Sequence, residues 1–270
     1  MNKALWITAG LVATAFTAGT VHFNNSSNAS VPAGITKAEM MSGKKAMANP
    51  VTDAGKPVVV EFFTSQGCSS CPPADRLAGR LAQEPNLLVI ERPVTYWDRL
   101  GWTDTLGKEE NTTLQRAYAR RTLGGRNGVY TPQAVVNGEK GLVGSREADL
   151  RELIAQARFS DLPEVEFAHK EDGSTEIMIT GARSASANVQ LVGLDQTERV
   201  RIGRGENGGR SVTYTNVYKG ERSLGTLAGE GASYMIDAAD KRIDGANAYA
   251  VIVREGSAGR ILTGRMLPSA

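Results

Sequence analysis

The chain contains two cysteines, Cys68 and Cys71, in the sequence Cys-Ser-Ser-Cys-Pro-Pro. An apolar run over residues 58–63 precedes them, and Pro72 and Pro73 follow them as they would in the first turn of a helix. The pair therefore lies where a strand ends and a helix begins. Free N–H groups and the macrodipole at the start of a helix stabilise a thiolate. The pattern predicts a redox site.

Length and composition limit the other functions open to the chain. Its 270 residues are long enough for two domains. The formal net charge is +2, without the basic excess expected of a nucleic-acid-binding protein. With 41% hydrophobic and 22% charged residues, the composition is that of a folded globular protein. We expect no nucleic-acid partner.

The N-terminus has the pattern of a secretory signal. Lys3 is followed by a mostly apolar stretch over residues 4–21 and then by Asn and Ser residues. We expect residues 1–29 to be a signal peptide, and the protein to be exported to the periplasm or secreted. An uncleaved membrane anchor is the alternative, and it is the one membrane contact that the sequence indicates. Residues 30–55 are predicted to be a linker.

Strand and helix patterns alternate after the linker. Strands are predicted at residues 57–63, 87–94, 133–137 and 141–143, and helices at residues 72–83, 108–123 and 145–158. The order is βαβαββα. Asn137-Gly138 predicts a hairpin turn between the last two strands, and Ser145 is the expected N-cap of the last helix.

This order, with a CxxC at the first strand-to-helix junction, resembles the thioredoxin fold over residues 56–160. The resemblance implies a cis proline at the start of the strand facing the dithiol, and Thr131-Pro132 stands at that place. It further implies that the backbone of Thr131 pairs with an extended substrate. An ordinary trans turn proline is the alternative.

The same resemblance suggests a role for Glu61, which lies on the apolar strand before Cys68. In the thioredoxin family, a buried acid with a raised pKa helps to deprotonate the second cysteine, here Cys71. The spacing in this chain is one residue longer; an extra residue in the loop at residues 64–67 absorbs the difference, or else it turns Glu61 to the other face of the strand. The alternative is a structural carboxylate paired with Arg92.

Position alone assigns roles to the two cysteines. Cys68 is expected to be the exposed attacking thiol and Cys71 the buried resolving thiol. One alternative is a structural disulfide that closes a very small loop. Another is Cu(I) or zinc carriage, but the chain offers only His22 and His169 as imidazole ligands, with linker methionines for a soft ion. We therefore predict neither a metal nor a cofactor.

An aromatic segment follows the second predicted strand. Tyr96, Trp97 and Trp102 are expected to wall a substrate groove, because that strand ends near the dithiol in a thioredoxin-like domain. Asp98, between them, is a second candidate base. The alternative is that the rings cap the core beneath a long loop.

The predicted secondary structure changes after residue 160, from alternating strands and helices to strands alone. Short strands are predicted at residues 164–169, 176–180, 188–194, 200–204, 211–218, 233–237, 248–254 and 261–266. Such a density of strands without helices is typical of an all-β sandwich, so residues 161–270 are expected to form a β-rich sandwich domain. Residues 205–210, which are rich in glycine, are expected to form a plain hairpin turn.

Several of these segments together indicate a particular family. Residues 61–75, 96–98, 130–133 with 136–138, and 205–210 resemble blocks of an exported bacterial family described only as a domain of unknown function (DUF1223 type). The resemblance implies a thioredoxin-like domain followed by a β-rich domain. It supplies no substrate or activity.

Together the patterns predict an exported thiol–disulfide oxidoreductase. Cys68 and Cys71 are its redox pair, Glu61 a proton relay, and Thr131-Pro132 with Tyr96 and Trp97 its substrate contacts. Its expected partners are protein or small-molecule thiols and disulfides, and a redox donor or acceptor protein. The alternatives are a non-catalytic binding protein with a structural disulfide and a Cu(I) carrier. The direction of electron flow depends on thiolate stabilisation that sequence does not set.

Overall fold

The computed structural model describes residues 56–121, 128–158, 162–181, 186–227 and 229–269. The predicted signal peptide and linker lie outside these ranges, as does His22. All described residues fall within one unit, Pro50–Ala270. None of the helices in the described ranges has the length and apolar character that crossing a bilayer requires.

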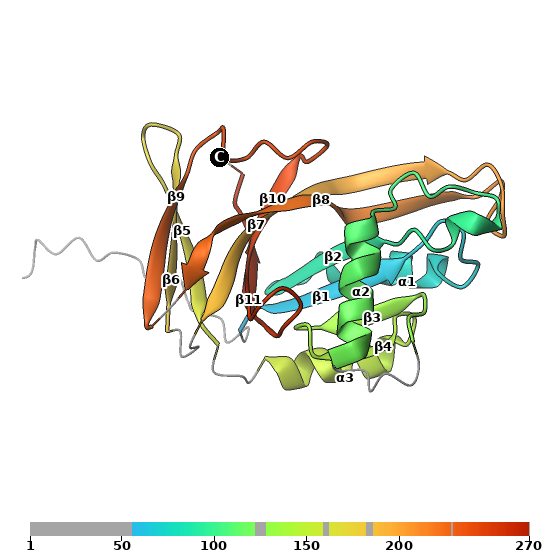
Figure 1. The fold of residues 1–270 in the computed structure, drawn as a ribbon, viewed down its shortest axis with the longest axis horizontal. Coiled ribbons are helices and arrows are strands. Elements are labelled where there is room, and N and C mark those ends of the chain that lie inside the picture. Colours follow the sequence, from blue (N-terminus) through green and yellow to red (C-terminus); the bar gives the residue numbers. More distant parts are fainter. Residues whose placement is uncertain (1–55, 122–127, 159–161, 182–185, 228, 270) are drawn as a thin grey trace, which may run out of the picture. The chain divides into compact units, whose positions relative to one another are not determined.

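The first half of the described chain alternates strands and helices (Figure 1). The elements are β1 (Val58–Thr64), α1 (Pro72–Leu81), β2 (Leu87–Pro93), a short 3₁₀ helix (Asp98–Leu100), α2 (Glu109–Arg121), β3 (Gln133–Val136), β4 (Lys140–Val143) and α3 (Glu147–Ala157). This is the predicted order βαβαββα. β1 pairs with β2 in parallel and with β3 antiparallel, and β3 pairs with β4.

The second half contains strands and no helix in its described part. They are β5 (Glu164–His169), β6 (Thr175–Thr180), β7 (Ala187–Arg201), β8 (Ser211–Leu227), β9 (Gly231–Ile236), β10 (Ala248–Arg254) and β11 (Ile261–Met266). β7 is one strand of 15 residues where two short strands were expected, and β8 has 17 residues. The two pair along their length as one hairpin. That pairing keeps the polar residues 195–198 extended, although their polarity suggests a break.

Two sheets result, and the larger one contains strands from both halves of the chain. Its order is β11-β10-β7-β8-β2-β1-β3-β4, while β5, β6 and β9 form a three-stranded sheet. The join is made where Glu91 of β2 pairs with Val217 of β8 in parallel, and where the Asn216 amide donates to Val89 O at 3.0 Å. Four strands expected in a separate sandwich thus extend the sheet that holds β1. The architecture is mixed α/β.

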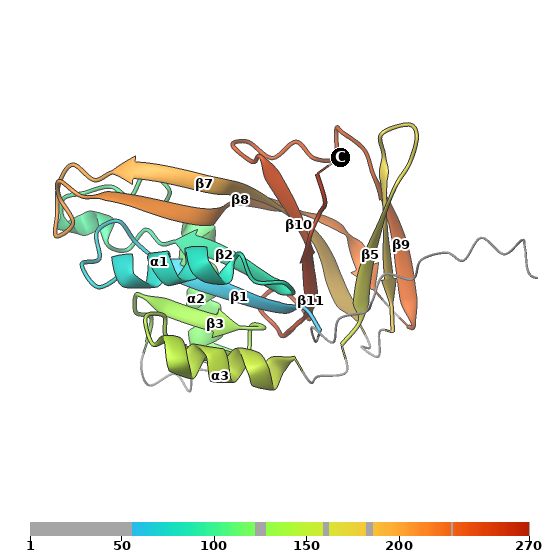
Figure 2. The same ribbon diagram turned by 180° about the vertical axis from the view of Figure 1, so that it is seen from behind.

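Alternating residues of β1 face different helices. Val58, Val60 and Phe62 pack with α1 and α3, which Figure 2 shows on one side of the sheet. Phe63 points the other way, where its ring meets the Tyr118 ring of α2 edge-on at 6.0 Å between centroids. Because side chains alternate along a strand, Glu61 lies on the α2 face and points away from the helix that begins at the cysteines.

Two local predictions have opposite outcomes. The turn at Asn137-Gly138 is confirmed, with φ of 47° and 65° at its two residues, the left-handed values that such a hairpin turn requires. The N-cap prediction for Ser145 is wrong. Helix α3 begins at Glu147 with Arg146 in the cap position, and the Ser145 carbonyl accepts the Glu147 N–H at 3.1 Å.

Candidate functional site

A disulfide joins Cys68 and Cys71 at the junction of β1 and α1. The Cys71 N–H donates to the Cys68 carbonyl at 3.1 Å, closing the turn between them. Cys71 is the N-cap of α1, and Pro72 and Pro73 occupy its first positions, where no backbone N–H is needed. The predicted placement of the dithiol at the start of a helix is confirmed.

The expected exposure of Cys68 is wrong. Both cysteines have 0% relative exposure, whereas Ser69 and Ser70 between them are exposed. The Cys68 sulfur lies 3.4 Å from the Ser70 hydroxyl. The tip of the β7–β8 hairpin is hydrogen-bonded to the loop that carries Cys68. We call this tip, residues 205–210, the covering turn.

Two side chains of the covering turn bind the backbone around Cys68. The Asn207 amide, 1% exposed, donates to the carbonyl oxygens of Gln66 at 3.0 Å and Cys68 at 2.8 Å. The Glu206 carboxylate accepts the Ser69 N–H at 3.1 Å, and hydrogen bonding from Ser69 lowers the pKa of Glu206. The covering turn is a hairpin turn, as predicted, but it also forms part of the candidate site. No local sequence signal marks this contact, since about 140 residues separate its partners.

Asn207→Ala is expected to speed reduction of the disulfide by dithiothreitol about tenfold. The two hydrogen bonds contribute about 1–3 kcal/mol to the closed position of the covering turn, and without them the sulfurs become accessible more often. The measurement is the pseudo-first-order reduction rate of the folded protein. Arg199→Ala, at an exposed position of β7, is the matched control and should leave the rate unchanged. Equal rates for all three proteins would contradict a covering role for Asn207.

The peptide bond between Thr131 and Pro132 is cis, as predicted. Trp97 connects this segment to the cysteine loop. Its indole Nε1 donates to the Thr131 hydroxyl at 2.9 Å, and its Cβ lies 3.2 Å from where a Cβ would stand on Gly67. A side chain at position 67 would crowd Trp97, so glycine favours this close approach, and Trp97 lies between the two segments.

A pocket of about 460 Å³ opens beside the disulfide loop. Its lining residues are Gly67, Trp97, Leu100, Trp102, Gly205 and Glu206. Trp97 and Trp102 thus wall a groove, as expected, and the Trp102 indole is fixed by donating to Gln66 Oε1 at 2.8 Å. Tyr96 packs instead at the edge of the Phe63 and Tyr118 cluster. Asp98, the second candidate base, accepts the Asp104 N–H at 3.0 Å and orders the aromatic loop.

Glu61 is fully buried in a charged network on the α2 face. Its Oε1 accepts hydrogen bonds from Arg92 at 2.7 Å and Arg254 at 3.0 Å, and its Oε2 accepts one from the Tyr118 hydroxyl at 2.5 Å. Burial favours the neutral acid, but the charges of Arg254 and Arg92 outweigh it and lower the pKa of Glu61 to about 2. The raised pKa expected of a general base is therefore wrong. The alternative, a carboxylate paired with Arg92, is confirmed.

A pair of buried acids, Asp75 and Glu91, lies on the cysteine side of the sheet. Asp75, 1% exposed, is one helical turn beyond Cys71, and its N–H donates to the Cys71 carbonyl at 3.1 Å. Its Oδ1 accepts the Thr64 hydroxyl at 2.5 Å. Burial raises the pKa of Asp75 to about 7. Burial and the charge of Asp75 also raise the pKa of Glu91, so the pair retains a proton near neutral pH. The i+4 spacing from Cys71 is the sequence signal that identifies Asp75.

Within the described ranges, no cluster of three or more His, Cys, Asp or Glu side chains is arranged to hold a metal ion. His169 is on β5, where its Nδ1 lies 3.1 Å from the Thr175 hydroxyl. The linker methionines considered as Cu(I) ligands, Met40, Met41 and Met47, lie outside the described residues.

Fold and site together define a mixed α/β protein with a buried CxxC disulfide at the start of a helix. The sequence matches the family described as protein of unknown function (DUF1223) over residues 59–254, and the chain belongs to that family. No curated protein matches it.

The solved structures that resemble the chain include the following two. The X-ray crystal structure of protein AGR_C_4864 from Agrobacterium tumefaciens aligns with a TM-score of 0.66 and 29% identity, over 79% of this chain and 94% of that one. HBP35 of Porphyromonas gingivalis aligns with a TM-score of 0.50 and 12% identity, over 79% of this chain and 75% of that one. The similarity to HBP35 shows the fold alone.

Proposed function

We propose that the chain is an exported thiol–disulfide oxidoreductase whose N-terminal segment, residues 56–160, is thioredoxin-like. One observation carries the proposal: the CxxC disulfide at the start of α1 is connected through Trp97 to the cis Thr131–Pro132 segment. The strand order β2-β1-β3-β4 and the element order βαβαββα support the thioredoxin-like assignment. Export rests on the N-terminal sequence.

The reaction is an exchange of disulfides through a mixed intermediate. A client thiolate attacks the Cys68 sulfur, the Cys68–Cys71 bond breaks, and Cys71 leaves as a thiolate that takes up one proton. A second client thiol loses its proton and attacks the client sulfur of the mixed disulfide, releasing Cys68. The client dithiol loses two electrons and becomes a disulfide, while the protein's disulfide is reduced. The same steps in reverse reduce a client.

The exchange of the Cys71 proton is assigned to Asp75. It follows Cys71 by one turn of α1, and with Glu91 it forms a buried pair that retains a proton near neutral pH. A group with a pKa near the working pH serves both as proton donor and as acceptor. Glu61 does not have such a pKa, because Arg254 and Arg92 keep its carboxylate ionised near neutral pH. In this proposal Asp75 takes the relay role that the sequence suggested for Glu61.

Client binding is assigned to the groove beside the disulfide. The backbone of Thr131 is proposed to pair with an extended client segment, and the rings of Trp97 and Trp102 give the pocket an apolar wall. Cys68 is fully buried and the covering turn is bonded to its carbonyl through Asn207, so the proposal is that the covering turn moves aside during exchange.

A second function is favoured by one specific observation. Both sulfurs belong to fully buried residues, which is the environment of an inert structural disulfide. In that case the protein is a non-catalytic binding protein, with the same pocket as its ligand site.

Alkylation of the reduced, folded protein distinguishes the two functions. An exchange catalyst is expected to alkylate at Cys68 with an apparent pKa below about 7.5, against about 8.5 for a free thiol, while Cys71 stays protected. The measurement is the iodoacetamide rate against pH, with site assignment by mass spectrometry. Protein unfolded in urea is the control, in which both thiols react alike. Protection of both thiols in the folded protein would instead support the structural disulfide.

A further inference from the structure

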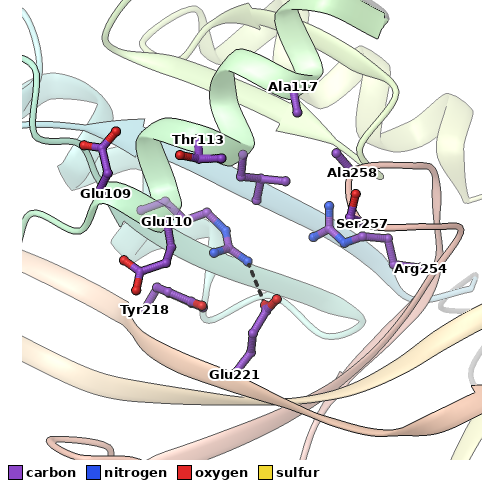
Figure 3. Close-up of a pocket in the computed structure, with 11 residues that line it drawn as sticks. Glu109, Glu110, Thr113, Ala117, Tyr218, Glu221, Arg254, Ser257 and Ala258 are labelled. Carbon is purple, nitrogen blue, oxygen red and sulfur yellow. Dashed lines mark ion pairs between the residues drawn. The ribbon is translucent and has the colours of Figure 1, made fainter.

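A second pocket, of about 500 Å³, lies on the α2 face of the sheet between α2, β8 and the loop after β10 (Figure 3). It shares no lining residue with the pocket beside the disulfide. Glu109, Glu110, Thr113 and Ala117 reach it from α2, Tyr218 and Glu221 from β8, and Arg254, Ser257 and Ala258 from the opposite side. Nothing in the proposed exchange reaction uses this pocket.

The floor of the pocket carries an excess of buried positive charge. Arg92 is 1% exposed and Arg254 2% exposed, and both direct hydrogen bonds to the one carboxylate of Glu61. Burial works to lower the pKa of Arg92, but the charges of Glu61 and Glu221 outweigh it and raise the pKa overall, while the charge of Arg254 opposes this rise. Two buried cations thus share one buried anion. A carboxylate placed between them would relieve that repulsion.

One nitrogen of Arg92 is available to donate a hydrogen bond to a ligand carboxylate. Its Nη2 is buried and makes no hydrogen bond within the described residues. The Glu221 carboxylate approaches it only to 4.0 Å, from a side chain that is 34% exposed. This ion pair is too long for a direct hydrogen bond, so a ligand carboxylate can displace Glu221 toward solvent at little cost.

The walls and the rim favour a particular kind of molecule. Leu114, Ala117 and Ala258 are apolar, and the Tyr218 ring stacks with the Arg92 guanidinium at 4.2 Å. At the rim, Glu109 is already paired with Arg116 at 3.2 Å. Glu110, exposed at the start of α2, adds a negative charge at the pocket opening. The pocket is therefore cationic at its floor, apolar along its walls and acidic at its mouth.

We propose that this pocket binds a small organic carboxylate on an apolar chain, with a cationic group at its far end. The carboxylate contacts Arg92 and Arg254, which offer the charge-assisted hydrogen bonds that a carboxylate prefers. The apolar chain lies along Leu114 and Ala117. The far cationic group faces Glu110. The volume suits a molecule of that size.

Calorimetric titration of the full chain at low ionic strength tests this assignment, with 6-aminohexanoate, hexanoate and hexanamide as probes. Both carboxylates are expected to bind, 6-aminohexanoate more tightly, and hexanamide at least about tenfold more weakly than hexanoate, because it lacks the charge that Arg92 and Arg254 recognise. Glu221→Gln should tighten hexanoate binding. Glu110→Gln should remove the preference for 6-aminohexanoate.

Filling the pocket provides the structural control. Ala117→Phe occupies the apolar wall without touching the charged floor, and should weaken both carboxylates at least about tenfold at unchanged melting temperature. If Ala117→Phe does not fold, Thr113→Phe at an exposed lining position serves the same purpose. Equal binding of hexanoate and hexanamide, no binding of either carboxylate, or unchanged binding in the filled variant would each overturn the proposal.

Discussion

Replacement of Glu61 with alanine is expected to lower the free energy of unfolding by about 3–5 kcal/mol. The side chain is fully buried and accepts hydrogen bonds from Arg92, Arg254 and Tyr118. Its removal leaves two buried guanidinium groups without their shared anion. The measurement is urea denaturation at pH 7, and Glu152→Ala, at an exposed position of α3, is the control with a change below about 0.5 kcal/mol. A loss below about 1 kcal/mol for Glu61→Ala would contradict a structural role.

The same network predicts how stability depends on pH. The pKa of Glu61 falls from 4.5 to about 2 on folding, so its ionised form stabilises the protein above pH 4.5. As the pH falls through this window toward 2, protonation removes about 3 kcal/mol. Other carboxyl groups titrate in the same range, so the informative quantity is the difference between wild type and Glu61→Gln. That difference should shrink as the pH is lowered, and a constant difference would contradict the assignment.

Cys71→Ala is expected to trap nearly all of the protein as a mixed disulfide when the reduced variant meets glutathione disulfide, whereas Cys68→Ala should trap almost none. Cys68 precedes the helix and carries the exposed Ser69 and Ser70 beside it, while Cys71 begins α1 and is followed by the buried Asp75. Without Cys71, nothing within the pair resolves the bond between glutathione and Cys68. Mass spectrometry of the quenched mixture measures the trapped fraction.

Each cysteine variant serves as the other's control, because both lose the disulfide. Circular dichroism should show the same fold in each before the reaction. Equal trapping by the two variants would contradict the division of roles between Cys68 and Cys71. Trapping by neither, in folded protein, would favour the structural disulfide.

The sequence predicts the first half of the fold well because its signals are local. The apolar runs of β1 and β2 are buried along their whole length, and Asn137-Gly138 forms the expected turn. The cis bond at Thr131–Pro132 follows from the resemblance to a known fold. In each of these cases, the residues that decide the structure are close together in the chain.

The remaining features of the fold and of the candidate site depend on contacts between residues far apart in sequence. Asn207 donates to the Cys68 carbonyl across 139 positions, and Arg254 pairs with Glu61 across 193. No periodicity or motif connects such pairs. The length of β7 and β8 is likewise set by their pairing, since residues 195–198 alone suggest a break. Glu61 is an example. Its pKa is determined by its distant partners and not by its position before Cys68.

Asp75 is a different case, since its signal is present in the sequence. It lies in the helix predicted over residues 72–83, four residues after Cys71, and residues at this spacing lie on one side of a helix. The resemblance to the thioredoxin family instead implies a relay role for Glu61, the acid on the strand before Cys68. The structure shows that β1 presents Glu61 to α2, while Thr64 at the end of β1 meets Asp75.

The reduction potential of the Cys68–Cys71 pair tests the proposed exchange activity most directly. Glutathione titration of the purified protein, with acid quenching and mass spectrometry, gives the equilibrium value. An exchange catalyst is predicted to lie between about −270 and −120 mV, the range of known catalysts of this reaction. A potential below about −300 mV, typical of structural disulfides, would contradict the activity.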